Sequence, residues 1–452
     1  MAFVSRMPGK TTELIQMFRQ GVCMRNYESD AYRKYQSSIE QRQKVVRTSG
    51  FPYSQQTAVQ GKRQIVERSA STKRKRTREK GKPYYDYDLL LVIIFLMCFG
   101  LVMLYSSSAY SAQNDYNNDM FFFTRQAIIG IIGFIAMFIV SKIDYHLYGA
   151  YAKEFFWFSM FLMALVQTPL GKTVNGARRW IRLPGGLSLQ PAEFTKVAVI
   201  LFIAYAICLL GQKAKKWDGI KILLFYGIIA FLGAYKLTDN LSTAVIILLI
   251  TVVLIFVVHP KTKPFVAGVI AVGIVGIIGI ICLKYTLAES DNFRMRRIIA
   301  WLNPEANADT DSYQFLQGLY AIGSGGFFGK GLGNSTQKLH AIPEAQNDMI
   351  LAVICEELGV FGAILILCLF AFMLYRLLFI ARNAPDLYGS LVATGIFAHI
   401  ALQVTLNIAV VTGLMPTTGV TLPFISYGGT AIVILLAEMG IALGISSKIR
   451  LK

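Results

Sequence analysis

Residues 241–258 read Leu-Ser-Thr-Ala-Val-Ile-Ile-Leu-Leu-Ile-Thr-Val-Val-Leu-Ile-Phe-Val-Val, eighteen positions without a charged side chain. A helix that crosses the hydrocarbon core of a bilayer needs roughly 20 mainly apolar residues. Every backbone polar group inside lipid must be hydrogen-bonded within the protein, so a run of this kind predicts a spanning helix. The whole chain has the same character, because 54% of its 452 residues are hydrophobic and only 16% are charged. This composition is too apolar for an ordinary soluble protein.

Nine further apolar runs occupy much of the chain. They lie at 88–107, 125–141, 154–170, 191–210, 219–236, 264–284, 347–380, 387–412 and 424–446. We therefore expect an all-α membrane protein with about ten transmembrane helices. Residues 285–346 would form a large extracellular loop between helices 7 and 8, and loops of this length are usually functional or disordered. The glycine-rich stretch 313–333 favours a re-entrant or interface-lying hairpin within that loop.

Positive charge is concentrated in the N-terminal tail. The chain has a formal net charge of +19, and residues 1–86 hold 19 Lys and Arg against 7 Asp and Glu. Basic residues directly before a first spanning run are typical of a cytoplasmic segment held at anionic lipid, and this explains the charge better than nucleic-acid binding does. We expect a basic, largely disordered cytoplasmic tail over 1–86, a ten-helix domain over 87–447 and a short basic cytoplasmic end over 448–452.

Acidic residues cluster where the long outer loop meets the eighth predicted helix. Glu344 and Asp348 are four residues apart and would share one helix face if the helix began before 344. An ionisable group at this depth is costly and is a functional candidate, although either carboxylate could instead cap the helix N-terminus. Glu356 and Glu357 lie deeper and need buried partners, so a structural tie between helices is favoured over direct chemistry for them.

Basic residues also occur on the predicted outer side, where the charge rule makes them scarce. Arg178 and Arg179 precede the fourth predicted helix, on which Glu193 and Lys196 have the i,i+3 spacing of an ion pair. That pair could be purely structural. Alternatively, Lys196 together with Arg178 or Arg179 would bind a phosphate group, because arginine forks match phosphate and lysine acts as a compact charge.

Prolines and glycines interrupt the backbone between the last two predicted helices. Non-helical backbone at membrane depth must line protein or a water-filled cavity, which makes Asn407, Pro416, Ser426 and Gly428 candidate cavity residues.

A further basic cluster over 294–301 ends in a tryptophan, and we expect it to contact lipid headgroups. The four histidines lie at no metal-ligand spacing, so the residues themselves predict no metal site.

Five motifs, in order along residues 87–447, resemble the SEDS family (shape, elongation, division and sporulation). They are Tyr105-Ser-Ser-Ser-Ala, Asn175-Gly-Ala-Arg-Arg-Trp-Ile, Leu189-Gln-Pro-Ala-Glu-Phe-Thr-Lys, Pro343-Glu-Ala-Gln-Asn-Asp with Glu356-Glu-Leu-Gly, and Pro416-Thr-Thr-Gly-Val-Thr-Leu-Pro-Phe-Ile-Ser-Tyr-Gly-Gly. The resemblance implies a ten-helix bacterial membrane protein that polymerises lipid II into glycan strands. The first motif and the basic tail are more similar to the FtsW-like division branch than to the rod-elongation branch.

The same resemblance implies that the position of Asp348 is the catalytic acid or base. We then expect Asp348 to deprotonate the acceptor hydroxyl, and Lys196 with Arg178 or Arg179 to contact the diphosphate of lipid II, with Glu193 and Glu344 at the substrate. A divalent cation, Mg²⁺ or Mn²⁺, could accompany the diphosphate. A β-linked product from an α-linked donor requires a single inverting displacement.

The resemblance further implies a class B penicillin-binding protein and other division proteins as partners, in the cytoplasmic membrane at the septum with both termini inside. A lipid II flippase, a scaffold that only recruits a transpeptidase, and an elongation or sporulation paralogue are the alternatives. A flippase has no use for a general base at the outer rim, so the position of Asp348 favours the enzyme.

Overall fold

The computed structural model describes residues 84–174, 177–182, 188–260, 293–305, 312–337 and 345–450, with a few isolated positions between 263 and 276. Nearly all of the predicted tail, most of the predicted helix 264–284 and Glu344 lie outside the described residues. The chain divides into two units, and the elements below all belong to the unit Pro83–Ile449.

Helices dominate this unit, and seven of those described are long and apolar enough to cross a membrane. The helices are α4 (Tyr87–Tyr116), α5 (Phe121–Lys142), α6 (Tyr145–Ala150), α7 (Ala152–Leu165), α8 (Pro191–Leu210), α9 (Trp217–Leu237), α10 (Leu241–Val258), α12 (Phe293–Leu302), α13 (Tyr313–Ser324), α14 (Ile350–Asn383), α15 (Leu387–Val411) and α16 (Thr430–Ser446), with a 3₁₀ turn at Gly211–Lys215. The predicted all-α membrane class is confirmed, and nine of the ten predicted runs coincide with described helices.

Polar residues fix the starts of several spans. The side chains of Asp86, Asn240 and Asp386 each accept a hydrogen bond from a backbone N–H in the first turn of α4, α10 and α15. Proline occupies the first turn of α8, where its missing N–H costs nothing. These caps place the helix starts at the borders of the apolar runs. The predicted starts of these spans therefore lie close to the observed ones.

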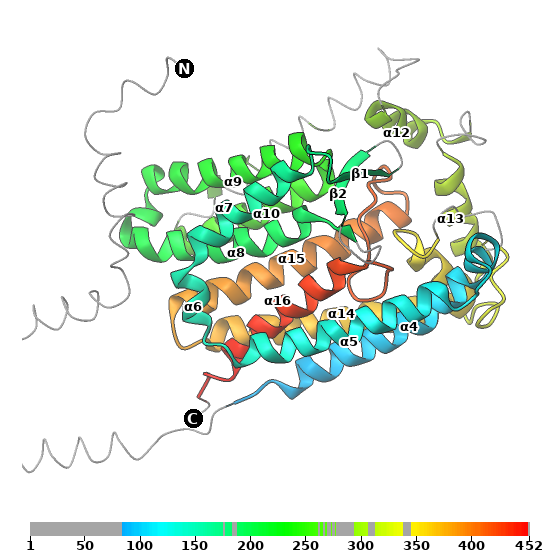
Figure 1. Ribbon diagram of the computed structural model, residues 1–452, viewed down its shortest axis with the longest axis horizontal. Coiled ribbons are helices and arrows are strands. Elements are labelled where there is room, and N and C mark those ends of the chain that lie inside the picture. The colour runs from blue at the N-terminus through cyan, green and yellow to red at the C-terminus, as the bar shows by residue number, and fades with distance from the viewer. Residues whose placement is uncertain are drawn as a thin grey trace, which may run out of the picture. The chain divides into compact units, whose positions relative to one another are not determined.

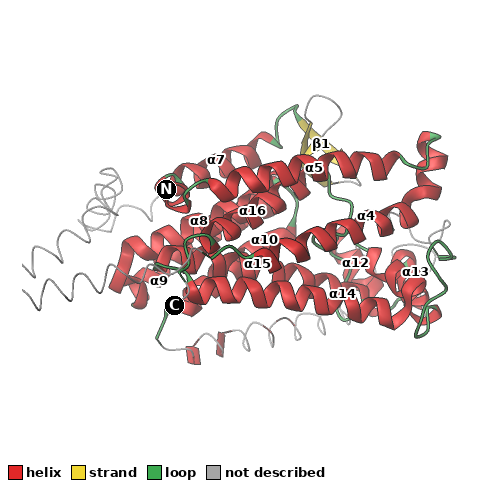
Figure 2. Cartoon of the chain, turned by 90° about the horizontal axis from the view of Figure 1, so that it is seen from below, coloured by secondary structure: helices red, strands yellow, loops and turns green. Residues whose placement is uncertain are grey.

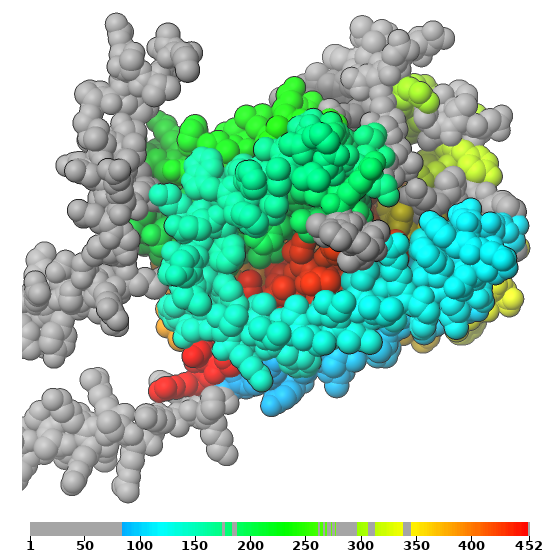
Figure 3. Space-filling model, in the orientation of Figure 1, coloured from blue at the N-terminus to red at the C-terminus, as the bar shows by residue number. Residues whose placement is uncertain are grey.

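The spanning helices run side by side, and the connections gather at the two ends of the bundle (Figure 1). One end carries α12, α13 and the strands, and the opposite end carries α6 and the ends of the unit (Figures 1 and 2). Those ends meet, because the backbone N–H of Tyr84 donates to the carbonyl of Ile449 at 3.0 Å. Figure 3 shows a hollow on one face, where α16 is visible between α5 and the α6–α7 segment.

A small antiparallel sheet follows α7, and the sequence did not predict it. Its strands are β1 (Gly171–Val174), β2 (Ala177–Arg182) and β3 (Ser188–Leu189), in the order β1-β2-β3. The register pairs Gly171 with Ile181 and Ile181 with Leu189. Pairing satisfies the backbone of a segment that is too short and too polar to form another span. The Thr430 hydroxyl donates to the carbonyl of Ser188 at 2.7 Å and so ties the sheet to the start of α16.

Helix α14 is broken at Gly359, whose φ of 67° and ψ of −166° lie in a region that is essentially restricted to glycine. The loop after α13 forms hydrogen bonds with the backbone groups that the break leaves unpaired on both of its sides. On one side, the N–H groups of Lys330 and Gly331 donate to the carbonyls of Glu356 and Glu357, each at 2.9 Å. On the other side, the N–H groups of Val360 and Phe361 donate to the carbonyls of Gly326 and Phe327, each at 3.1 Å.

Glu356 anchors the same loop and is fully buried. It accepts from Lys330 Nζ at 2.7 Å, from the Thr336 N–H at 3.1 Å and from the Ser335 hydroxyl. Glu357 accepts from the hydroxyl of Ser106 on α4 at 2.7 Å. Hydrogen bonds thus join both glutamates to neighbouring segments. The stretch 313–333, predicted as a re-entrant or interface hairpin, is helix α13 followed by a glycine-rich loop packed against α14.

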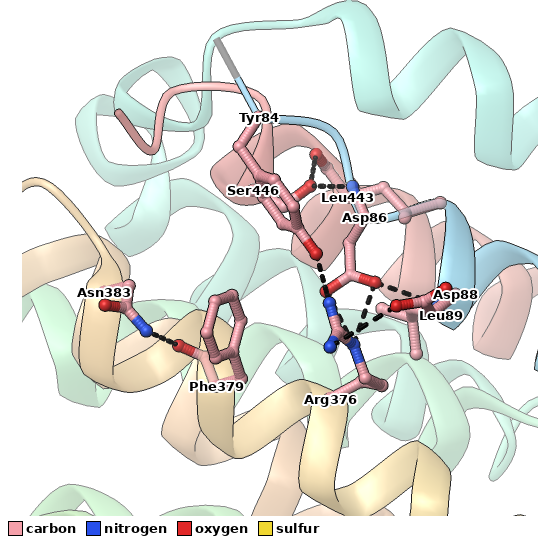
Figure 4. A network of polar contacts seen from close by, with 9 residues as sticks. All are labelled: Tyr84, Asp86, Asp88, Leu89, Arg376, Phe379, Asn383, Leu443 and Ser446. Atoms are coloured by element: carbon pink, nitrogen blue, oxygen red, sulfur yellow. Dashed lines mark hydrogen bonds and ion pairs between the residues drawn. The ribbon is translucent and has the colours of Figure 1, made fainter. Parts of the chain in front are cut away.

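A buried ion pair joins α4 and α14 at the opposite end of the bundle (Figure 4). Arg376 Nη2 lies 2.9 Å from Asp86 Oδ2, and Arg376 Nε donates to Asp86 Oδ1 at 3.1 Å. The Tyr84 hydroxyl also contacts this guanidinium, and the Asp86 N–H donates to the Ser446 hydroxyl at 3.2 Å. A two-point arginine–carboxylate contact fixes both distance and orientation, so it holds the start of α4 against α14, and the Ser446 contact adds the end of α16.

Candidate functional site

A cavity of about 630 Å³ lies at the end of the bundle that carries the sheet, α12 and α13. It is lined from the ends of α5, α8, α10 and α15, from the sheet and from the 419–431 segment. Five basic side chains and two carboxylates are among its lining residues. These are Arg125, Lys172, Arg179, Lys196, Arg297, Glu193 and Asp348. The excess of positive charge suits an anionic ligand.

Asp348 lies in the turn just before α14 and lines the cavity. Gln314 of α13 donates to its carboxylate at 3.4 Å, and Asn407 of α15 donates to its backbone carbonyl at 2.9 Å. Helix α14 starts at Ile350, so the condition for a shared helix face, a helix that begins before 344, is not met at Asp348. The helix-capping alternative is not supported either, because the cap residue of α14 is Met349 and it has no side-chain cap.

Lys196 and Glu193 form the predicted ion pair on α8, with Nζ 2.8 Å from the Glu193 carboxylate. Both residues line the cavity, and Lys196 is only 1% exposed. Its ammonium also donates to Gln403 Oε1 of α15 at 3.0 Å. An ammonium group has three donors, so these two contacts leave one for a ligand in the cavity.

Strand β2 separates the two arginines that the sequence left as alternatives. The register with β1 shifts here, because Thr173 pairs with Arg178 and Lys172 pairs with Trp180. Arg179 is therefore the extra residue of a β-bulge, and such a bulge re-aims a side chain. Arg179 lines the cavity and donates to the carbonyl of Asp239 at 3.2 Å. Arg178 is absent from the lining and donates to the carbonyl of Thr168 at 2.5 Å. The structure therefore brings Arg179, and not Arg178, to the cavity of Lys196.

Three basic residues of the cavity were missed by the sequence reasoning. Arg125 was read as part of a span, although a single arginine at the outer start of an apolar run was a usable signal. Lys172 lies on β1, in the same outer connection as Arg178 and Arg179. The cluster around Arg297 was expected to contact lipid headgroups, but Arg297 lines the cavity and donates to the carbonyl of Thr417 at 3.1 Å. Trp301 likewise donates to the carbonyl of Gly413 at 2.8 Å.

The broken segment after α15 forms part of the cavity wall. Asn407 is fully buried and donates to the carbonyl of Val420 at 2.8 Å as well as to that of Asp348. Ser426 braces the segment by accepting from the Leu422 N–H at 2.8 Å, and Gly428 lines the cavity. Pro416 is not among the lining residues. Asn407 thus couples Asp348 to the wall.

The resemblance to the SEDS family allows a divalent cation beside the diphosphate, and its ligands would have to come from the side chains of the cavity or from the substrate. The described part of the chain contains no group of three His, Cys, Asp or Glu side chains that could hold a metal ion. Glu193 is already paired with Lys196, so a cation would take most of its ligands from the substrate.

Comparisons with known proteins agree with this architecture. The "Cell cycle protein" family profile, which groups FtsW, RodA and SpoVE, matches residues 87–451. A "Probable peptidoglycan glycosyltransferase FtsW" from Geobacter sp. (strain M18) is 37% identical over 369 residues, covering 81% of this chain and 98% of the relative. "Stage V sporulation protein E" of Bacillus subtilis (strain 168) is 41% identical over 366 residues, covering 79% of this chain and 96% of the relative.

A solved structure supports the same fold. It comes from a study of the structural coordination of polymerization and crosslinking by a peptidoglycan synthase complex. Its chain aligns with a TM-score of 0.66 at 25% identity, covering 80% of this chain and 97% of that one.

Proposed function

This chain belongs to the family of FtsW, RodA and SpoVE, and from that premise we propose that it polymerises lipid II into glycan strands at the outer face of the cytoplasmic membrane. It is a peptidoglycan glycosyltransferase. The observation that carries the finer proposal is the cavity at one end of the bundle, which Asp348 lines together with a set of basic side chains. A carboxylate can act as a base, and the basic groups can offset a diphosphate.

The donor in this reaction already carries a good leaving group, a diphosphate on the anomeric carbon. Asp348 takes the proton of the acceptor hydroxyl while the acceptor oxygen bonds to the anomeric carbon. The bond from that carbon to the diphosphate oxygen breaks, and the departing charge is stabilised by Lys196, Arg179 and Arg125. One displacement inverts the anomeric configuration, and no covalent enzyme intermediate is required.

The distribution of charge supports an outer location for this cavity. Lys213 and Lys215 lie in the 3₁₀ turn after α8, and Lys142 and Arg382 lie in the last turns of α5 and α14. These residues are at the end of the bundle away from the sheet, and short basic connections favour the cytoplasmic side. On this basis the termini of the unit face the cytoplasm and Asp348 faces the outside.

We further propose a role in septal wall synthesis, with a class B penicillin-binding protein as the crosslinking partner. The FtsW-named relatives favour this role, and the solved relative comes from a peptidoglycan synthase complex. A sporulation role is the second candidate, because the SpoVE protein is 41% identical. Depletion in the native cell separates the two: a division enzyme gives filaments without septa, whereas a sporulation enzyme leaves vegetative division intact and blocks spores.

The test of the chemistry is lipid II polymerisation by the purified full chain with its transpeptidase partner. We expect wild type to make long glycan chains and Asp348→Asn to make none, because an amide cannot accept the acceptor proton. Asp115→Asn is the matched control, since Asp115 is exposed near the end of α4 and does not line the cavity. Polymerisation by Asp348→Asn at the wild-type rate would rule out this base. Lipid II translocation in proteoliposomes without polymerisation would support the flippase instead.

A further inference from the structure

A chain of buried polar groups runs from the cavity into the membrane-spanning core. The proposed reaction assigns no role to its last two members, His399 and Glu438. Gln403 and His399 lie one turn apart on α15, and Glu438 lies on α16. His399 is 2% exposed and Glu438 is 1% exposed. Neither lines the cavity. Buried ionisable groups in a spanning helix are costly and are functional candidates by default.

Hydrogen bonds fix the orientation of the Gln403 amide. Its Nε2 donates to the carbonyl of Thr421 at 3.1 Å, which turns Oε1 toward the other two neighbours. Oε1 accepts from Lys196 Nζ at 3.0 Å and lies 2.9 Å from His399 Nε2. An amide oxygen is an acceptor only, so His399 Nε2 must carry a proton.

The other imidazole nitrogen faces a carboxylate. His399 Nδ1 lies 2.9 Å from Glu438 Oε2. Either the imidazole is doubly protonated beside a carboxylate, or a protonated Glu438 donates to Nδ1 of the neutral ring. Both states keep the proton on Nε2 that Gln403 requires. Gln403 therefore requires the Nε2-protonated ring, and Glu438 holds the orientation of that ring through Nδ1.

We propose that His399, oriented by Glu438, is a positioning residue that holds Lys196 toward the cavity through Gln403, and so sets the affinity of the site for the diphosphate of its lipid substrate. The inference rests on the proposed function, in which Lys196 meets that diphosphate. If His399 stops donating, Gln403 Oε1 loses one of its two donors and the amide can turn. The Lys196 ammonium then loses the partner that opposes the pull of Glu193.

Two substitutions at one position separate this role from a structural tie. Asn places its amide nitrogen near the position of Nδ1, so His399→Asn keeps the contact with Glu438 and loses the donor to Gln403. Gln places its amide nitrogen near Nε2, so His399→Gln keeps the donor to Gln403 and loses Glu438. A positioning role predicts that Gln preserves binding better than Asn. A mere tie between α15 and α16 predicts the reverse order.

The experiment measures binding of radiolabelled undecaprenyl diphosphate to the purified full chain in nanodiscs. Lys196→Met should weaken binding about tenfold or more, as expected for the loss of a charged hydrogen bond. His399→Asn should weaken it about three- to tenfold, and His399→Gln should stay within about threefold of wild type and bind more tightly than His399→Asn. Equal affinities of the two His399 variants, or weaker binding by Gln than by Asn, would overturn the proposal.

A second pair covers the case in which the His399 variants do not fold. The Glu438→Gln amide can still donate to Nδ1 and should bind within about twofold of wild type, whereas Glu438→Leu should bind about threefold or more weakly. Wild-type affinity in Glu438→Leu would overturn the proposal. If Lys196→Met itself binds normally, the diphosphate role of Lys196 fails and the positioning role falls with it. If Lys196→Met is weak while His399→Asn and Glu438→Leu are normal, only the positioning role fails.

Discussion

The break in α14 at Gly359 leads us to expect that Gly359→Ala strongly destabilises the contact between α14 and the loop after α13. A Cβ at this position would lie 2.4 Å from both the Gly329 nitrogen and the Phe327 carbonyl oxygen. The backbone conformation of Gly359 alone costs a non-glycine residue on the order of 1–3 kcal/mol. The loop would have to move away, and the four backbone hydrogen bonds across the break would be lost at about 0.5–1.5 kcal/mol each, or roughly 2–6 kcal/mol together.

Hydrogen exchange with mass spectrometry in nanodiscs measures this directly. The amides that donate the four bonds, at 330–331 and 360–361, should lose protection by about thirtyfold or more in Gly359→Ala, since 1.4 kcal/mol corresponds to a factor of ten. Gly323→Ala is the matched control, because a Cβ there meets nothing within 4 Å and alanine is the better helix former. Unchanged protection of both segments in Gly359→Ala would refute the claim that the loop and the broken helix depend on each other.

Further substitutions test the ion pair between Arg376 and Asp86 and the choice between the two arginines of β2. Arg376→Met should destabilise the protein by about 3–5 kcal/mol, because it leaves the fully buried Asp86 unpaired, and the double variant with Asp86→Leu should recover part of that loss in thermal unfolding. A double variant less stable than Arg376→Met would contradict this account. Arg179→Ala should raise the KM for lipid II about tenfold. Arg178→Ala should lower thermal stability with little change in KM. A raised KM in Arg178→Ala with an unchanged KM in Arg179→Ala would show that Arg178, and not Arg179, contacts the substrate.

The sequence located most of the candidate site because its signals are local. Glu193 and Lys196 are close in sequence on one helix, so their pairing follows from helical spacing and was confirmed. Glu356 and Glu357 lie too deep for capping, so the need for partners was predictable, but the partners were not. They are supplied by Ser106 on α4 and by the loop 330–336, which no spacing rule connects to α14.

What the sequence determined by itself was the membrane class, the positions of most spans and the local pair of Glu193 and Lys196, because apolar length, charge placement and helical spacing act within single segments. The tertiary structure alone decided which groups meet. The shifted register between β1 and β2 placed Arg179 at the cavity, while Arg178 contacts Thr168 instead. The packing of α15 against α8 and α16 joined His399 and Glu438 to Lys196. The physical reason is that hydrogen bonds and charge contacts between helices depend on helix rotation and register, which are set by packing against neighbours and leave no periodic trace in any one segment.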